Sequence, residues 1–195
     1  MKDYGLIVTD TSPLITPAKA DEVDLLLRLN VPVEVPDVVF FEAASEGYED
    51  GNLLRRWMND NKGLVRIVQT ERGVQWQVLK DQGLKPRGFG ELAAAETIDM
   101  FVRTNPGRTP IILYEDTDVE KLRGLPSETE LITTGTYLRE LEASRRIQSA
   151  DHILDMAAAG GRNVDRQREQ PGNDDLAEAL GRQTKGSAEH GVARP

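Results

Sequence analysis

Four acidic residues stand where a parallel α/β sheet could bring them together. Two of them follow short apolar runs that predict buried strands, and the other two lie where helices are predicted. The carboxyl ends of parallel strands and the helices that follow them share one edge of the sheet. We therefore expect the four carboxylates to converge. They are Asp10, Glu42, Glu91 and Asp116.

Converging carboxylates would repel one another and take up protons unless a cation lay between them. Mg²⁺ prefers oxygen ligands, and one or two such ions can activate a water for displacement at phosphorus. Asp118 is a further candidate ligand, although it could also be the N-cap of a helix. The chain has no cysteine and only two histidines, which excludes thiolate chemistry and nearly excludes imidazole sites.

Some positions near these acids allow two interpretations. Neighbouring side chains of a strand point to opposite faces, so Glu115 would replace Asp116 as the inward acid if the register differed by one. Glu96, five residues after Glu91, is either a further ligand or a surface charge. The residue types alone leave these alternatives open.

Short apolar runs alternate with segments of helical periodicity, which indicates an α/β domain with a mostly parallel sheet. We expect a helix to begin at Thr16-Pro17, with Thr as its cap and Pro in its first position. We predict one domain over residues 1–160. Residues 161–195 are polar, which predicts a flexible tail outside the core. Strands are expected at about 5–9, 31–36, 64–68, 110–114 and 131–133.

The charge of the chain lies in the predicted domain. The 195 residues carry 33 acids and 24 bases, a net charge of −9, and residues 161–195 carry six of each. An acidic domain binds phosphates poorly through its own side chains, whereas a bound cation would reverse the local charge. No apolar run approaches the roughly 18 residues of a transmembrane helix, and no signal peptide is apparent. We expect a cytoplasmic protein without a membrane partner.

Five short segments resemble the motifs of PIN-domain nucleases, in the right order over about residues 5–158. The first is a strand followed by Asp-Thr-Ser, and the second is a Val-Pro segment that leads to an acidic helix. The third is Gly-Glu at the start of an Ala-rich helix, and the fourth is an acidic strand end. The last looks like the Gly-Thr step of the VapC-type toxin branch. The segments are 8–15, 35–42, 90–95, 113–118 and 134–138.

This resemblance implies a three-layer α/β/α sandwich around a short, mostly parallel sheet. It implies an endoribonuclease that depends on Mg²⁺ or Mn²⁺ and is the toxin of a type II toxin–antitoxin pair. A homodimer and a cognate antitoxin are then the expected protein partners. The metal-site acids of the family fall on Asp10, Glu42, Glu91 and Asp116, and Ser12 matches the small hydroxyl residue that supports the first acid.

Two other functions compete with this one. A PIN-like module that has lost catalysis would keep the acids and act by binding a partner. A phosphatase-type enzyme would use Asp10 as a nucleophile, but that class needs a second Asp two residues later, where this chain has Ser12. It also needs a lysine near the later acids, for which Lys121 is the candidate.

Overall fold

The computed structural model describes residues 2–44 and 49–189, and for residues 49 and 182–189 only the backbone is described. Its centre is a sheet of five parallel strands in the order β3-β2-β1-β4-β5. The strands are β1 (Tyr4–Thr9), β2 (Val33–Pro36), β3 (Val65–Val68), β4 (Thr109–Tyr114) and β5 (Glu130–Thr133).

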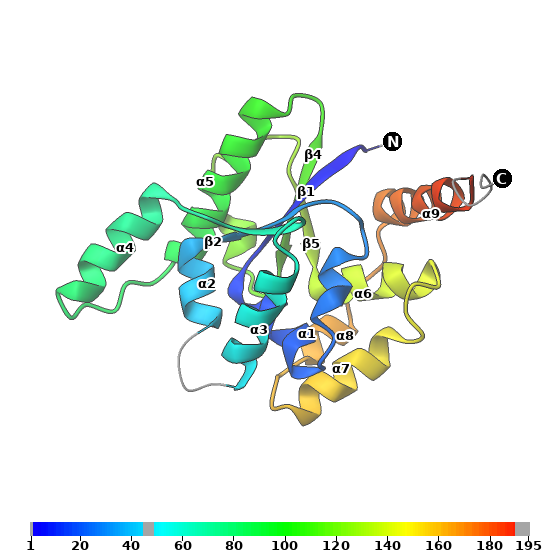
Figure 1. Ribbon diagram of the computed structural model, residues 1–195, viewed down its shortest axis with the longest axis horizontal. Coiled ribbons are helices and arrows are strands. Elements are labelled where there is room, and N and C mark those ends of the chain that lie inside the picture. The colour runs from blue at the N-terminus through cyan, green and yellow to red at the C-terminus, as the bar shows by residue number, and fades with distance from the viewer. Residues whose placement is uncertain (1, 45–48, 190–195) are drawn as a thin grey trace.

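Helices cover both faces of this sheet, so the predicted α/β fold with three layers is confirmed (Figure 1). Two short 3₁₀ segments, Val23–Leu27 and Val119–Lys121, lie in the connections. The helices are α1 (Thr11–Lys19), α2 (Asp37–Ala43), α3 (Glu49–Asp60), α4 (Glu71–Asp81), α5 (Phe89–Thr104), α6 (Thr134–Ala143), α7 (Ala150–Ala159), α8 (Asp165–Arg168) and α9 (Asp174–Glu189).

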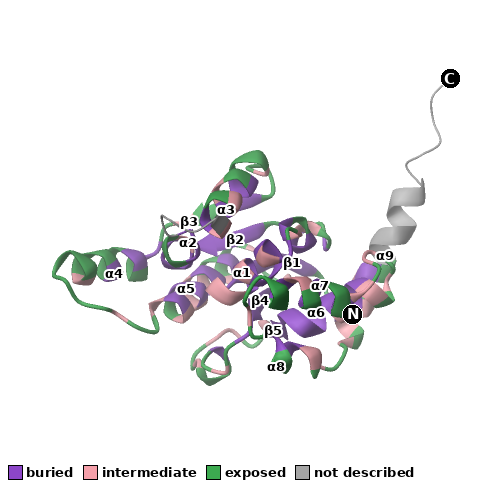
Figure 2. Ribbon diagram, turned by 90° about the horizontal axis from the view of Figure 1, so that it is seen from below, coloured by how far each residue is buried: buried purple, intermediate pink, exposed green. Residues whose placement is uncertain are grey.

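The alternation of side chains along the strands divides the core into two layers. Leu6 and Val8 of β1 pack on one face with Ile98 of α5. Ile7 points to the other face and belongs to the larger cluster, which includes residues of α1, α3, α6 and α7. Figure 2 shows the buried residues concentrated in and around the sheet, while α4 extends away from it.

Helix α1 begins earlier than predicted. It starts at Thr11, directly after β1, and Pro17 lies inside it. Pro13 occupies the first turn, where the missing amide of a proline has no partner within the helix. Thr16 and Pro17 are buried in the middle of the helix, so tertiary packing outweighs the local signal of a cap followed by proline.

Over residues 161–181, the segment after Gly160 does not lie outside the core, contrary to our prediction, and residues 190–195 of the predicted tail lie outside the described residues. Val164, Leu176 and Leu180 are buried and belong to the larger cluster. Gln167 is also buried, and its side chain accepts a hydrogen bond from the Gly135 amide (2.9 Å). Both α8 and α9 thus pack against α6.

Candidate functional site

Asp10 occupies the carboxyl end of the central strand β1. Its backbone amide donates to the Leu113 carbonyl of β4 (3.0 Å), so the strand pairing fixes its position. The residue is buried, and as the N-cap of α1 it makes no side-chain capping hydrogen bond. The Thr11 amide lowers the pKa of its carboxyl group. The side chain of Asp10 is therefore placed at the edge of the sheet without serving as a helix cap.

Glu42 approaches the same place from α2. Its Oε2 atom accepts a hydrogen bond from the Thr11 hydroxyl (3.0 Å). Gly90, at the start of α5, lies between the two acids. A Cβ atom built on it would lie 3.6 Å from Asp10 Oδ1 and 3.7 Å from Glu42 Oε2. These are ordinary van der Waals distances, so α5 begins close to both carboxylates.

Glu91 is in the first turn of α5, where the helix dipole favours a negative charge. The helix dipole alone would therefore account for a glutamate at this position, without a bound metal ion. The charge of Glu91 nevertheless acts on both Asp10 and Glu42, since it raises the pKa of each. The helix start and the acidic cluster therefore coincide at Glu91.

The charges of the other three predicted acids all act on the pKa of Asp10. Burial first, and then the charges of Glu91, Glu42 and Asp116, raise the pKa of Asp10 to about 6, against the opposing effect of the Thr11 amide. Desolvation, followed by the Glu91 charge, raises the pKa of Glu42, while its hydrogen bond from Thr11 opposes the shift. Residues that are far apart in the sequence thus act on one another at one edge of the sheet.

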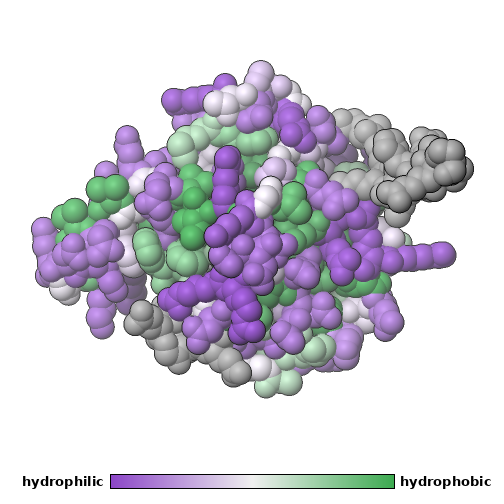
Figure 3. Space-filling model, viewed as in Figure 1, coloured by the Kyte–Doolittle hydropathy of each residue, from purple (hydrophilic) through white to green (hydrophobic). Residues whose placement is uncertain are grey.

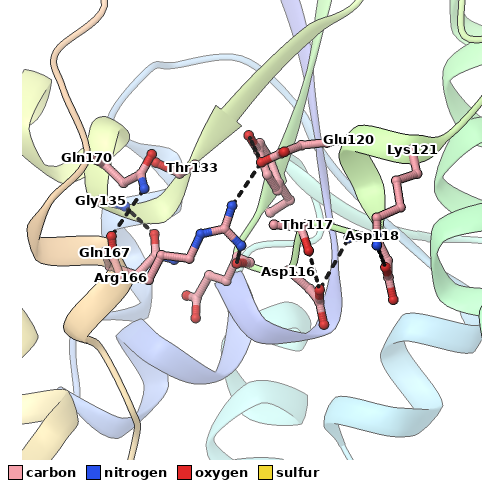
Figure 4. A network of polar contacts seen from close by, with 12 residues as sticks. Asp116, Thr117, Asp118, Glu120, Lys121, Thr133, Gly135, Arg166, Gln167 and Gln170 are labelled. Atoms are coloured by element: carbon pink, nitrogen blue, oxygen red, sulfur yellow. Dashed lines mark hydrogen bonds and ion pairs between the residues drawn. The ribbon is translucent and has the colours of Figure 1, made fainter.

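Asp116 is exposed just beyond the end of β4. Its Oδ1 atom accepts a hydrogen bond from the Asp118 amide (3.2 Å). Asp118 is the N-cap of the following 3₁₀ segment, and its carboxylate pairs with Lys121 (2.5 Å). Figure 4 shows these contacts, which direct the Asp118 carboxylate to the lysine. The same ion pair occupies Lys121, which was the candidate lysine of the phosphatase hypothesis.

Glu115 follows directly after β4, which ends at Tyr114, and it lies in a different environment from the exposed Asp116. It is 9% exposed and forms an ion pair with Arg162 (2.9 Å). The charges that raise the pKa of Asp10 include Asp116 and not Glu115. Of the two alternatives, the ion pair of Glu115 and the effect of the Asp116 charge on Asp10 favour Asp116 as the acid of the cluster.

Two other predicted positions have structural roles or no visible role. The carboxylate of Glu96 accepts hydrogen bonds from the Glu71 amide (2.6 Å) and the Arg72 amide (3.2 Å) at the start of α4. Glu96 thus caps a helix. Ser12 is half-buried in the first turn of α1, and its hydroxyl forms no hydrogen bond with another described residue.

Three basic residues near the site were not among the residues predicted from the sequence. Lys80 of α4 lowers the pKa of Glu42 through its charge and lies over the Trp76 ring at 5.2 Å. Arg162 and Arg166 contact Glu115 from the segment predicted to be a tail. Arg166 also pairs with Glu120 (Figure 4). The spacing of Lys80 four residues after Trp76 was a usable signal, but nothing local marked the two arginines.

The donor set suits a hard cation, since every candidate ligand is a carboxylate oxygen. Within the described residues, no three acidic or histidine side chains are placed to hold one metal ion together. Mg²⁺ needs fewer protein ligands, because it usually binds one or two carboxylates and keeps several waters. A buried Asp10 surrounded by like charges is the arrangement that a cation would relieve. The residues therefore fit a water-rich site and not a closed cage.

One face of the molecule is mixed in character. Figure 3 shows hydrophilic residues over most of one face, with smaller hydrophobic areas between them. Among the described residues, no helix is long and apolar enough to cross a membrane. No protein-family model and no curated protein matches this chain.

Proposed function

We propose that this protein is an endoribonuclease of the PIN type that depends on Mg²⁺ or Mn²⁺. The observation that carries the proposal is the electrostatic state of Asp10. Its carboxyl group is buried at the carboxyl end of a central parallel strand, and this burial, together with the charges of three acids from other segments, raises its pKa to about 6. Such a concentration of negative charge is costly to folding and is typical of functional sites.

Each residue would have a distinct part in the reaction. Asp10 and Asp116 would hold the ion from the ends of two adjacent strands, and Glu42 and Glu91 would bind it directly or through its waters. The Thr11 hydroxyl orients the Glu42 carboxylate by its hydrogen bond. When bound, a divalent ion lowers the pKa of a coordinated water and offsets charge on the phosphodiester. Lys80 would add positive charge beside Glu42 for an approaching RNA backbone.

The biological setting that we propose is a type II toxin–antitoxin pair, with an antitoxin protein and a second copy of the chain as partners. Exposed apolar side chains on α4 support protein contacts. Val74 and Val78 lie one helical turn apart and are 65% and 50% exposed, on a helix that extends from the body of the molecule (Figure 1). An adjacent pair of this kind can form part of an interface.

One observation favours the alternative of an inactive PIN-like binding module. The described residues contain no group of three acids or histidines placed to hold a single ion. Four acids can persist in a protein that has lost turnover and acts through a partner. A measurement of metal-dependent cleavage separates this alternative from the nuclease.

The test is cleavage of a pool of structured RNAs by the purified chain with Mg²⁺, with Mn²⁺ or with EDTA. We expect cleavage with either metal, and we expect Asp10→Asn to reduce it to the level measured in EDTA. Glu91→Gln and Glu96→Gln form a matched pair on one helix. The first should lose cleavage, whereas the second should retain it because Glu96 caps α4.

Two results would contradict the proposal. Full activity in Asp10→Asn would refute the site. No cleavage with any metal, by folded protein shown to be free of an antitoxin, would support the binding module instead.

A further inference from the structure

Two arginines that follow α7 hold the last residue before Asp116. Arg162 Nη2 pairs with Glu115 Oε2 at 2.9 Å, and Arg166 Nη1 donates to the Glu115 carbonyl at 3.3 Å. The other carboxylate oxygen of Glu115 is buried and forms no hydrogen bond with a described residue. Arg162 is therefore the side chain that compensates the buried charge of Glu115.

Arg162 also reaches the helix that follows Asp10. Its Nε atom donates to the Thr16 hydroxyl (3.3 Å), and Thr16 is fully buried within α1. One planar guanidinium thus joins α1 to the end of β4. Because a guanidinium presents its donors in a fixed fork, it restrains the relative position of the two elements that it bridges.

These two elements carry two of the candidate metal ligands. Asp10 immediately precedes α1, and Asp116 immediately follows Glu115. On the backbone side, the Asp10 amide already bonds to the Leu113 carbonyl of β4. The Arg162 bridge adds a side-chain restraint on the same pair of elements. Both contacts thus join the two elements that carry these carboxylates.

We propose that Arg162 is a positioning residue that sets the separation of Asp10 and Asp116 and so tunes the affinity of the site for a divalent cation. This inference rests on the proposed function, because it assumes that these acids bind a metal ion. Arg162 itself contacts neither acid. Its effect passes through Thr16 and Glu115, from a segment whose sequence predicted no role in the site.

The test is a titration of the metal-free full chain with Mn²⁺, in which electron paramagnetic resonance measures the free ion. We expect Arg162→Gln to weaken Mn²⁺ binding about 10-fold, the scale seen when residues that orient metal ligands are changed. Arg168→Gln is the matched control. Arg168 lies in the same segment but pairs with the exposed Asp155, so its loss should leave Mn²⁺ affinity unchanged.

A second variant guards against loss of the fold in Arg162→Gln. Arg162→Lys keeps a positive charge beside Glu115, but one ammonium group cannot reproduce the guanidinium fork. We expect it to fold, as judged by circular dichroism, and to bind Mn²⁺ several-fold more weakly than the wild type. Wild-type affinity in either folded variant would overturn the inference. Failure of the wild-type chain to bind Mn²⁺ would instead overturn the metal site of the proposed function.

Discussion

Asp10 makes folding stability depend on pH in the direction opposite to that of a buried acid with a cationic partner. Its folded pKa is raised to about 6 from 3.8, so the folded state binds a proton more readily than the unfolded chain does. Folding stability from this group therefore increases as the pH falls through 6 toward 4 and is lost as the pH rises. The ionised carboxylate weakens the fold at neutral pH.

Replacing Asp10 by Asn removes this penalty while keeping the shape of the side chain. In EDTA at pH 7.5, we expect Asp10→Asn to raise the free energy of unfolding by about 2–3 kcal/mol, from a shift of about 2 units at 1.36 kcal/mol each. The gain should shrink at pH 5. Urea unfolding at both pH values measures it. Equal free energies of unfolding for the two proteins at pH 7.5 would show that the ionised Asp10 carboxylate does not destabilise the folded state.

At the scale of elements, the position of α4 depends on a buried contact with α2. Asp37, at the start of α2, is almost fully buried. Its carboxylate accepts hydrogen bonds from the Thr70 hydroxyl (2.8 Å) and the Thr70 amide (3.3 Å). Thr70 in turn caps α4 by accepting from the Gly73 amide. The helix that carries Lys80 is thereby joined to the helix that carries Glu42.

Gly73 is required by this contact, because a Cβ atom there would lie 1.9 Å from Asp37 Oδ2. Glycine in a helix usually costs about 0.5–1 kcal/mol relative to alanine. We expect the opposite for Gly73→Ala, a loss of about 1–3 kcal/mol, the scale of overpacking in a dense interior. Gly181→Ala in α9 is the control, since a Cβ there meets no atom within 4 Å. Chemical denaturation should give the two substitutions opposite signs, and a stabilising Gly73→Ala would contradict this view of the contact.

Local patterns predicted the elements that carry the acids. The β-branched runs before Asp10 and Asp116 and the Ala-rich segment after Glu91 became β1, β4 and α5, because short-range propensity and burial agree there. The parallel topology places Asp10 in a buried position at the sheet edge, where the charges of the other three acids act on its pKa. The start of α1 was mispredicted, because a cap followed by proline is a local signal and the burial of Thr16 and Pro17 is a tertiary one.

At the scale of the whole molecule, the prediction of a flexible tail after Gly160 was wrong for residues 161–181, which pack on the domain. Average polarity indicated a tail, yet the segment places a few apolar residues at helical spacing on the domain. Leu176 and Leu180 stand four residues apart, on one face of α9, and this pair was the available signal. No local feature predicted Arg162, because its partners Thr16 and Glu115 lie 146 and 47 residues away. Such contacts exist only after the chain has folded.

The C-terminal helix should therefore contribute to the stability of the whole domain. Leu176 and Leu180 are fully buried in the core cluster, and truncation of a buried leucine to alanine costs about 2–5 kcal/mol. We expect Leu176→Ala or Leu180→Ala to lower the free energy of unfolding by that amount. Leu84→Ala is the control, because Leu84 is 52% exposed and its loss should change stability by less than about 0.5 kcal/mol.

The same substitutions also report on the candidate site. Because α8 and α9 attach to α6 and Arg162 lies just before them, loosening this segment should weaken Mn²⁺ binding together with stability. Unfolding that proceeds in a single transition in these variants would indicate that the segment and the site belong to one cooperative unit. Wild-type stability in Leu180→Ala would instead mean that α9 is not part of this cooperative unit, and the contacts of Arg162 and Arg166 with Glu115 would then have to form without it.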